Sequence, residues 1–355
     1  NGCPSHLLEP TRTNLETNSS EFTGSLIGVS ILRDVEPSPD GNVSADKLLN
    51  NSASGEHLIN SNITLSMVNG TSYTCSVFFK SDGTGGQGVI RYYNGSTFHY
   101  GVFNLDNGVV SYNSSGTSII EEYPNGWYRC SISFTAAGTY SNPPIQIGVG
   151  NASNQFSYQG ASNLSHYFWG VQYEVGSFQT SYIPTTTSAV TRSAETANGA
   201  GDASTFNSSE GVLMAEIALQ DGDNETRQFS LSNGSDAENV KILQLNSSTI
   251  RFECKMSSGS NFVKDVVIAA ENNNKFLIQY KSNDYKIFVN GFAQSVGQRS
   301  TTPIGLNTIN FDRGDGASDF YGSTKQIQYF DSALNDSDLE KITSWTSFTD
   351  LANGQ

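Results

Sequence analysis

The sequence predicts an all-β protein built from two antiparallel β-sandwich (jelly-roll) domains, with one short helix close to its C-terminus. Only 15% of the 355 residues are charged, whereas Gly is abundant and there are 16 Tyr and 20 Phe. Aromatic and β-branched residues alternate with polar ones between turns rich in Gly, Asn and Ser, which is typical of strands. Since one hydrophobic core rarely serves a chain of this length, two domains are expected.

The first sandwich is expected over residues 1–184, because short alternating segments there end at turn sequences such as YNGS, LDNG and YPNG. The clearest alternation lies in SYTCSVFFK and WYRCSISF, as expected where one face of a sheet is buried. The expected strands are Ser72–Lys80, Gly88–Tyr93, Thr97–Phe103, Val109–Tyr112, Trp127–Phe134, Ile145–Val149 and His166–Val175.

Residues 185–208 are dominated by Thr, Ser, Ala and Gly without hydrophobic periodicity, which predicts a linker or an extended crossover. The second sandwich is expected over residues 209–355. Its clearest feature is KFLIQYKSNDYKIFVNG, two alternating runs that turn back on each other. A closing strand over Lys325–Phe330 and a helix over Asn335–Trp345 follow, the helix capped by Asn335 or Ser337.

The formal net charge of −15 argues against a nucleic-acid partner, because phosphate binding requires clustered Lys and Arg. No apolar run approaches the ~18 residues that a membrane-spanning helix needs. The first residues, NGCPSHLLEP, lack the basic and apolar regions of a signal peptide. Cys75 and Cys130 each occupy an apolar position of an expected strand, which predicts either two buried thiols or a cross-strand disulfide.

Three segments occur in an order that resembles one kind of protein: LLEPTRTNL (7–15), GWYR (126–129) and WGVQYEVGSFQTSYIPTTTSAVTR (169–192). Together they resemble the jelly-roll modules of phage and prophage virion proteins, such as tail fibres and head-spike fibres. Those modules are related in shape to carbohydrate-binding jelly rolls. Pro10 has no N–H to donate to a ladder, so the first segment fits a sheet edge.

The second half resembles a concanavalin- or laminin-G-like sandwich, through EGVLMAEI (210–217), YKIFVNG (285–291) and FYGSTKQIQYFDSALNDSDLEKITSW (320–345). The two resemblances imply a position on the virion surface, hence extracellular, together with other virion proteins. They also imply contact with glycans of a host cell surface or an extracellular polysaccharide. Virion fibres of this kind are threefold, so a homo-oligomer, most simply a trimer, is expected.

Polysaccharide cleavage is the main alternative, because concanavalin-like sandwiches include both lyases and glycoside hydrolases. A retaining hydrolase needs two carboxylates about 5–5.5 Å apart, whereas Glu210 and Glu216 are separated by an apolar run. Gln326 and Gln328 share a strand face, but the resemblance places that strand at the closing edge of the sheet. The sequence therefore favours a non-enzymatic protein with no catalytic residues; a purely structural capsid or fibre decoration is the second alternative.

The richest aromatic cluster is VIRYYNGSTFHYGVF (89–103), an expected hairpin. Sugar rings stack on aromatic side chains while flanking polar groups bind hydroxyls, so such a cluster suits a glycan surface. Alternation places Arg91 and Tyr93 on one face of the first strand. In the second strand, Phe98 and Tyr100 share a face and His99 takes the other.

One face of this hairpin must belong to the core. If Tyr92 and Phe98 point inward with Ile90, then Arg91, Tyr93 and His99 line the outer face. Ordinary packing of the whole cluster is the alternative. The candidate glycan-binding residues are Arg91, Tyr93, His99 and Tyr100.

The loop DRGDGASDF (312–320) carries Asp312, Asp315 and Asp319 between glycines that allow carbonyl groups to turn inward. Carboxylate and carbonyl oxygens are the ligands of Ca²⁺, so these residues form a candidate calcium site. Their spacing is not that of an EF-hand, and a solvated acidic loop is the alternative. No other cofactor is predicted.

Overall fold

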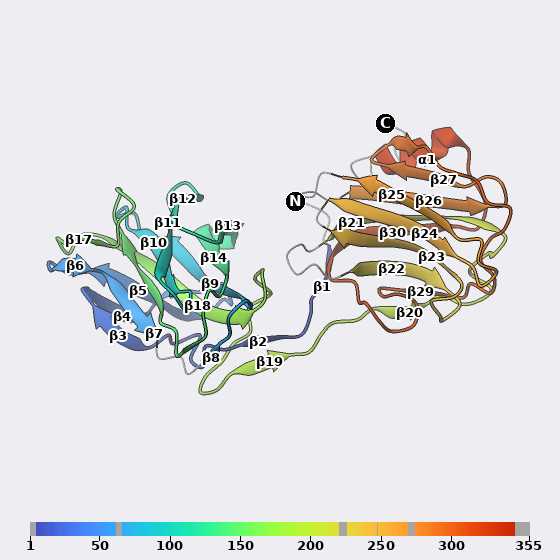
Figure 1. Ribbon diagram of the computed structural model, residues 1–355. Helices are drawn as coiled ribbons and strands as arrows, with labels where there is room; N and C mark the ends of the chain where they lie inside the picture. The colour runs from blue at the N-terminus through green and yellow to red at the C-terminus, as the bar shows by residue number, and fades with distance from the viewer. Residues whose placement is uncertain (1–4, 62–65, 220–225, 247, 269–273, 345–355) are drawn as a thin grey trace. The chain divides into compact units, whose positions relative to one another are not determined.

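The computed structural model describes residues 5–61, 66–219, 226–246, 248–268 and 274–344. Strands dominate throughout, all strand pairs are antiparallel, and the only α-helix in these ranges is α1 (Asp336–Ser344). This confirms the predicted fold class. The chain divides into two compact units, one spanning Thr11–Ser193 and the other combining Asn1–Pro10 with Ala194–Gln355. Figure 1 shows both.

The unit Thr11–Ser193 contains two six-stranded sheets, here called sheet I and sheet II. In spatial order, sheet I consists of β12 (Val109–Asn113), β11 (Phe98–Asn104), β10 (Gln87–Tyr93), β16 (Ile145–Gly150), β7 (Leu58–Ser61) and β3 (Gly24–Ile27). Sheet II consists of β13 (Thr117–Tyr123), β14 (Trp127–Thr135), β9 (Ser72–Ser81), β18 (Ser165–Val175), β5 (Val43–Asn50) and β4 (Val29–Pro37). Three short pairs complete the unit: β2 (Arg12–Asn14) with β19 (Val190–Arg192), β6 (Ser54–Glu56) with β17 (Ser157–Gln159), and β8 (Ser66–Met67) with β15 (Tyr140–Ser141).

The core of this unit lies between the inner faces of sheets I and II. Ile90 and Tyr92 of β10 face it, and so do Cys75 of β9 and Cys130 of β14. Both cysteines are free and buried, and burial raises the pKa of each thiol. The thiols therefore act as small apolar side chains in the core.

All seven strands expected in the first half are present within one or two residues of their predicted ends. Strands β3, β4, β5, β7 and β13 were not predicted: β3 and β7 have only four residues each, and β4, β5 and β13 mix charged with apolar residues without a regular alternation. In β4 the pairing with β5 shifts register between Leu32 and Glu36, and Asp34 has a positive φ of 53°. Such irregularity hides a strand from a simple period of two.

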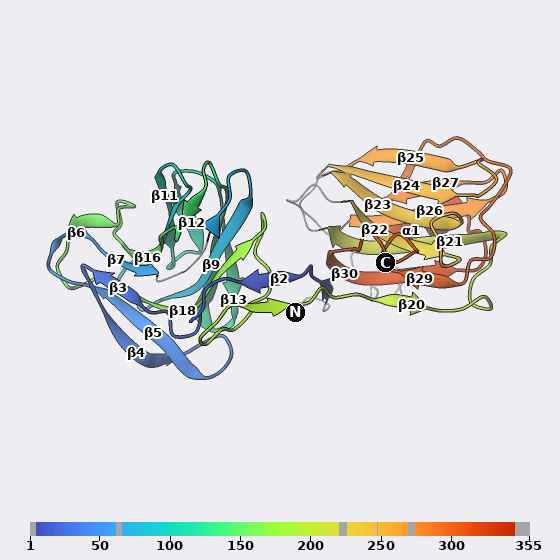
Figure 2. The same cartoon turned by 60° about the horizontal axis from the view of Figure 1, so that its bottom comes forward.

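The second unit also has two six-stranded sheets (Figure 2). The first contains β1 (His6–Leu8), β30 (Gly322–Phe330), β21 (Glu210–Leu219), β26 (Asn274–Lys281), β27 (Lys286–Val289) and β28 (Phe292–Gln294). The second contains β20 (Asn198–Ala200), β29 (Thr308–Asn310), β22 (Arg227–Ser232), β23 (Asn239–Asn246), β24 (Thr249–Lys255) and β25 (Phe262–Val267). Helix α1 packs Leu339 and Ile342 against Met214 and Phe288 of the first of these sheets.

Helix α1 begins after Asn335, whose side-chain oxygen accepts a 3.0 Å hydrogen bond from the backbone N–H of Asp338. This is one of the two caps that the sequence predicted. Trp345, the last residue of the expected helix, lies outside the described residues. No helix of the described chain is long and apolar enough to span a membrane.

The segment 185–208, expected as a linker or extended crossover, contains two short strands. Strands β19 and β2 pair with each other, and both belong to the unit Thr11–Ser193. Strands β20 and β29 pair with each other, and both belong to the second unit. LLEPTRTNL divides in the same way, since β1 pairs with β30 at a sheet edge and β2 pairs with β19. Pro10 lies between β1 and β2, where no ladder hydrogen bond is required of it.

Candidate functional site

The outer face of sheet I carries a row of five side chains from five different strands. Arg91 pairs with Tyr100 on one side and Gln146 on the other, Gln146 pairs with Asn60, and Asn60 pairs with Ser25. The flanking positions Ile90, Ile147 and Ile59 belong to the core, so these five face away from it. We call Ser25, Asn60, Gln146, Arg91 and Tyr100 the polar row.

Arg91 is held in place by four neighbours. Its Nη1 donates a 2.9 Å hydrogen bond to Oε1 of Gln146 and lies 3.1 Å from Oε1 of Glu56 on β6. Its Cζ lies 4.0 Å from the ring centroid of Phe98 and 4.9 Å from that of Phe156. These contacts leave the side chain only 14% exposed. The guanidinium is therefore a fixed support for two aromatic rings.

Three aromatic rings lie together beside Arg91, and we call Tyr93, Phe98 and Tyr140 the aromatic trio. The ring centroids of Tyr93 and Phe98 are 5.1 Å apart, and those of Tyr93 and Tyr140 are 4.7 Å apart. Phe98 is 40% exposed and Tyr140 is 42% exposed. The trio thus presents aromatic surface to solvent on rings that are braced by one another.

The other end of the outer face is covered. Phe156, from the loop before β17, lies edge-on to Tyr100 with ring centroids 4.7 Å apart. These two rings pack over the buried side chains of Leu58, Val89 and Val102. The aromatic trio lies outside this cover, and two of its rings are accessible to solvent.

The structure places three of the four sequence-predicted residues, Arg91, Tyr93 and Tyr100, on this outer face. His99 faces the other way: it pairs with Tyr92, and the two ring centroids are 5.6 Å apart on the inner side of the sheet. Phe98, expected in the core, is the residue that faces outward. The expected facing of His99 and Phe98 was therefore wrong, and glycan binding by Arg91, Tyr93, His99 and Tyr100 stays a prediction.

The reason lies in the cross-strand register. Tyr93 is opposite Phe98, and opposite residues in an antiparallel pair share a face. With Tyr92 buried in the core, Tyr93 and Phe98 both have to face outward. The sequence shows the alternation within each strand, but it does not show the register between them.

The three acidic residues of the candidate calcium site each have a hydrogen-bond or ion-pair partner within the protein. Asp315 forms a 2.7 Å ion pair with Arg313, and the buried Asp312 accepts a 2.8 Å hydrogen bond from Asn198. Asp319 accepts a hydrogen bond from a tyrosine hydroxyl. Among the described residues no group of three His, Cys, Asp or Glu is placed to hold a metal ion. Each of these carboxylates has a donor within the protein, and calcium binding by the three residues stays a prediction.

Gln326 and Gln328 share a strand face as predicted, and Nε2 of Gln328 donates a 3.1 Å hydrogen bond to Oε1 of Gln326. Nε2 of Gln326 in turn donates a 2.8 Å hydrogen bond to Oε2 of Glu216. Glu210 forms a separate 2.7 Å ion pair with Lys281, whose hydrogen bond lowers the pKa of this carboxyl. Each glutamate is thus engaged with its own neighbours rather than with the other.

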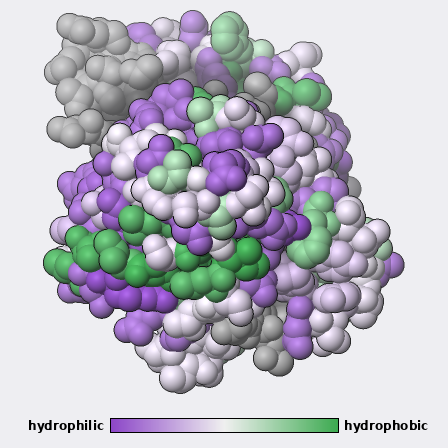
Figure 3. Space-filling view, turned by 90° about the vertical axis from the view of Figure 1, so that its left-hand side faces the viewer, coloured by the Kyte–Doolittle hydropathy of each residue, from purple (hydrophilic) through white to green (hydrophobic). Residues whose placement is uncertain are grey.

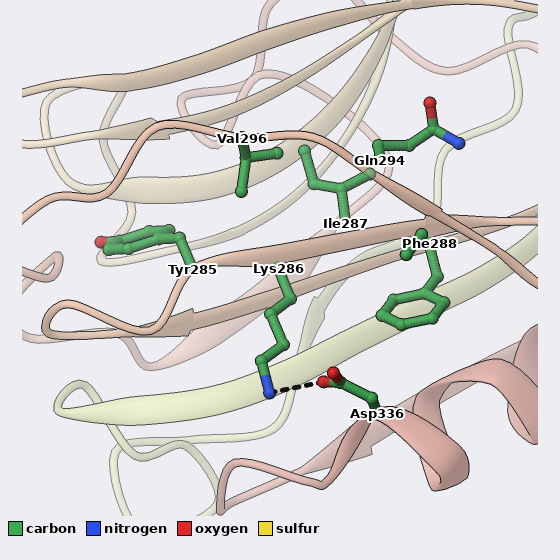
Figure 4. Close-up of a pocket in the computed structure, with 8 residues that line it drawn as sticks. Tyr285, Lys286, Ile287, Phe288, Gln294, Val296 and Asp336 are labelled. Atoms are coloured by element: carbon green, nitrogen blue, oxygen red, sulfur yellow. Dashed lines mark ion pairs between the residues drawn. The ribbon is translucent and has the colours of Figure 1, made fainter.

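A small cavity lies between β27, β28 and the start of α1 in the second unit (Figure 4). Its volume is about 110 Å³, and Tyr285, Phe288 and Val296 are among the residues that line it. Nζ of Lys286 lies 2.7 Å from Oδ1 of Asp336, and this ion pair is drawn in Figure 4. Pockets for small molecules measure roughly 300–1,000 Å³, so the cavity is too small for an oligosaccharide.

No protein-family model matches the sequence, and no curated protein sequence matches it. Similar solved structures include a sialidase CBM40 module from Ruminococcus gnavus bound to α2,3-sialyllactose, at 17% identity and a TM-score of 0.35. That match covers 41% of this chain and 94% of the module. Domains LG4–5 of the mouse laminin α1 chain match at 8% identity and a TM-score of 0.26, covering 88% of this chain and 92% of theirs. The likeness is one of β-sandwich fold.

Several residues of the outer face had no signal in the sequence. Asn60 and Gln146 join the polar row from strands more than 80 positions apart, and Glu56 and Phe156 come from outside the sheet. Single polar residues of this kind occur all along the chain. Only the pairing of β16 with both β7 and β10 brings them to Arg91.

Proposed function

We propose that the outer face of sheet I binds glycans, and that the protein is a virion surface protein, of tail-fibre or head-fibre type, that attaches to a host cell surface or extracellular polysaccharide. The observation that carries the proposal is the exposed aromatic trio next to the polar row. Braced rings beside amide and guanidinium groups provide both kinds of contact that a sugar ring needs.

The rigidity of the face supports this function. The ring of Tyr93 contacts the rings of Phe98 and Tyr140. The guanidinium of Arg91 contacts the ring of Phe98 and is itself held by Gln146 and Glu56. Binding to a preorganised surface avoids the entropy cost of ordering side chains in the complex. The weak contacts of single sugar rings benefit most from such a surface.

The virion part of the proposal is supported by the sequence resemblance. Two of the segments that carry it, 7–15 and 169–192, contribute the paired strands β2 and β19. Across this pair the hydroxyl oxygens of Thr13 and Thr191 lie 2.8 Å apart. The first and the last of these segments thus meet in one strand pair.

The test combines a glycan array with binding to whole bacterial cells. We expect Tyr93→Ala to lose binding in both assays, because it removes the centre of the aromatic trio. Phe292→Ala is the matched control, since Phe292 is a 74% exposed aromatic residue in the other unit. Equal binding by wild type and Tyr93→Ala would remove this face from the site, and absence of any binding to glycans or cells would refute the function.

Self-association is part of the same proposal. β3 and β4 are each one of the two edge strands of sheets I and II, and they follow each other in the chain through Gly28. Leu26, Ile27, Leu32 and Val35 of these strands are exposed. Figure 3, in which the left-hand side of Figure 1 faces the viewer, shows a stripe of hydrophobic surface. An open edge with apolar side chains favours contact with another copy of the chain.

Sedimentation velocity at micromolar concentration tests this part. We expect a homo-oligomer, most simply a trimer, and dissociation on Leu32→Lys, because a charge on the edge opposes pairing. Val267→Lys, which changes a 79% exposed residue on β25 of the other unit, should leave the mass unchanged. A monomeric wild-type protein would contradict the expectation.

A further inference from the structure

We infer that the outer face of sheet I selects uncharged glycans, that is, sugars without carboxylate, sulfate or phosphate groups. This inference rests on the proposed glycan binding and names its ligand class. The six strands of sheet I contain one Lys or Arg, which is Arg91, and no Asp or Glu. Apart from Arg91, the polar row consists of hydroxyl and amide groups, which bind sugar hydroxyls without favouring a charged group.

The one positive charge is already compensated. Nη1 of Arg91 lies 3.1 Å from a carboxylate oxygen of Glu56, and the same nitrogen donates to Gln146. The Phe98 and Phe156 rings contact the guanidinium as well. An acidic sugar would have to displace Glu56 or place its own negative charge next to it. Glu56 itself is 37% exposed, so it stands at the surface where such a ligand would approach.

The charge of the whole chain acts in the same direction. A formal net charge of −15 repels polyanions at distances up to the Debye length, before any contact forms. Specificity often comes from an unfavourable contact with the wrong ligand. Here the carboxylate of Glu56 would repel a negatively charged sugar. A neutral sugar ring would meet no such repulsion and would stack on the aromatic trio.

The experiment measures binding to neutral manno- and galacto-oligosaccharides and to their acidic counterparts, oligomannuronate and sulfated galacto-oligosaccharides, at low and high salt. Wild type should bind the better neutral ligand at least about tenfold more tightly than its acidic counterpart. Glu56→Gln removes the negative charge and frees Arg91. We expect this variant to gain binding to the acidic ligands, and the gain to disappear at high salt.

Glu36→Gln is the matched control. It changes the net charge by the same amount, but Glu36 lies on sheet II, where it forms a 2.7 Å ion pair with Lys80. This variant should keep the neutral preference of wild type.

Tighter binding of wild type to the acidic ligands would overturn the inference and leave glycan binding standing. The same response from Glu56→Gln and Glu36→Gln would overturn the role of Glu56. If neither ligand class nor any other glycan bound, the proposed function itself would fail.

Discussion

The side-chain amide of Asn14 donates a 2.8 Å hydrogen bond to the backbone carbonyl of Ile183, a residue 169 positions later in the chain. The Oδ1 atom of the same side chain accepts hydrogen bonds from the backbone N–H groups of Tyr173 (3.1 Å) and Glu16 (3.0 Å). Asn14 is fully buried. The side-chain amide of Asn14 therefore joins β2, the first strand of the unit Thr11–Ser193, to β18 and to Ile183 in the segment after β18.

Replacing this amide should destabilise the unit. Asn14→Ala leaves three buried backbone groups without their partner, and each buried unsatisfied group costs about 1–3 kcal/mol. We expect the free energy of unfolding, measured by chemical denaturation, to fall by at least the cost of one such group, about 1–3 kcal/mol. Thr13→Ala, one position earlier and on the exposed side of the β2–β19 pair, should lower it by less than about 1 kcal/mol. Equal effects of the two substitutions would contradict the role assigned to Asn14.

The neighbouring tyrosines of β10 should respond oppositely to truncation. Tyr92 is 1% exposed, its ring centroid lies 3.9 Å from that of Phe134, and its hydroxyl donates to the carbonyl of Ser115. Tyr92→Ala should cost about 3–5 kcal/mol of stability, as large aromatic truncations in cores do. Tyr93→Ala should abolish glycan binding with a much smaller loss of stability, because its ring lies on the outer face.

Melting temperature and glycan binding measured on the same two preparations separate these effects. A drop in melting temperature for Tyr93→Ala as large as that for Tyr92→Ala would show that Tyr93 is a core residue. Binding that survives in a folded Tyr93→Ala protein would remove the aromatic trio from the site.

Glu16 should make the unit less stable as the pH rises. The residue is 3% exposed, and burial raises the pKa of its carboxyl above the ordinary 4.5, against the hydrogen bond from the backbone N–H of Asn18. The folded state thus holds the proton more tightly than the unfolded state. The contribution of this group to stability is complete below pH 4.5 and is lost as the pH rises through the raised pKa.

Glu16→Gln keeps an oxygen for Asn18 and removes the charge. We expect this variant to be more stable than wild type at neutral pH, and the difference to shrink toward about pH 4 as Glu16 becomes protonated. Urea denaturation across this range measures the difference. Glu21→Gln, at an exposed position, should show no such pH-dependent gain. A constant difference for Glu16→Gln at all pH values would contradict the mechanism.

His166 should act in the opposite direction at mildly acidic pH. The ring is fully buried, its Nε2 lies 3.0 Å from the carbonyl oxygen of Gly148, and burial lowers its pKa below the ordinary 6.5. The unfolded state therefore binds a proton more readily than the folded state. Stability from this group is complete above pH 6.5 and declines as the pH falls through the lowered pKa.

Unfolding of wild type and His166→Gln at several pH values between about 7.5 and 5 tests this expectation. Wild type should lose stability toward low pH more steeply than the variant does. His6→Gln, which changes an exposed histidine, should retain the wild-type slope. Identical slopes for wild type and His166→Gln would show that another group causes the decline.

The sequence by itself determined the class of fold and most of the longer strands of the first unit. Alternation in SYTCSVFFK and WYRCSISF is a local property, because successive side chains of a strand point to opposite faces whatever the strand pairs with. The same holds for helix α1, whose N-cap is next to it in the chain, and for Gln326 and Gln328, which share a face two positions apart.

Only the tertiary structure decided which face of β10 and β11 is buried, and so which residues meet solvent. Alternation along a strand divides its side chains between two faces, but it does not show which face packs on sheet II. That is shown by the pairing of Tyr93 with Phe98 and by the packing of Tyr92 on Phe134. Contacts between residues distant in the chain depend on such pairings, and they bring Glu56 and Gln146 to Arg91. The same holds for Asp312, whose carboxylate accepts a hydrogen bond from Asn198, a residue 114 positions earlier in the chain.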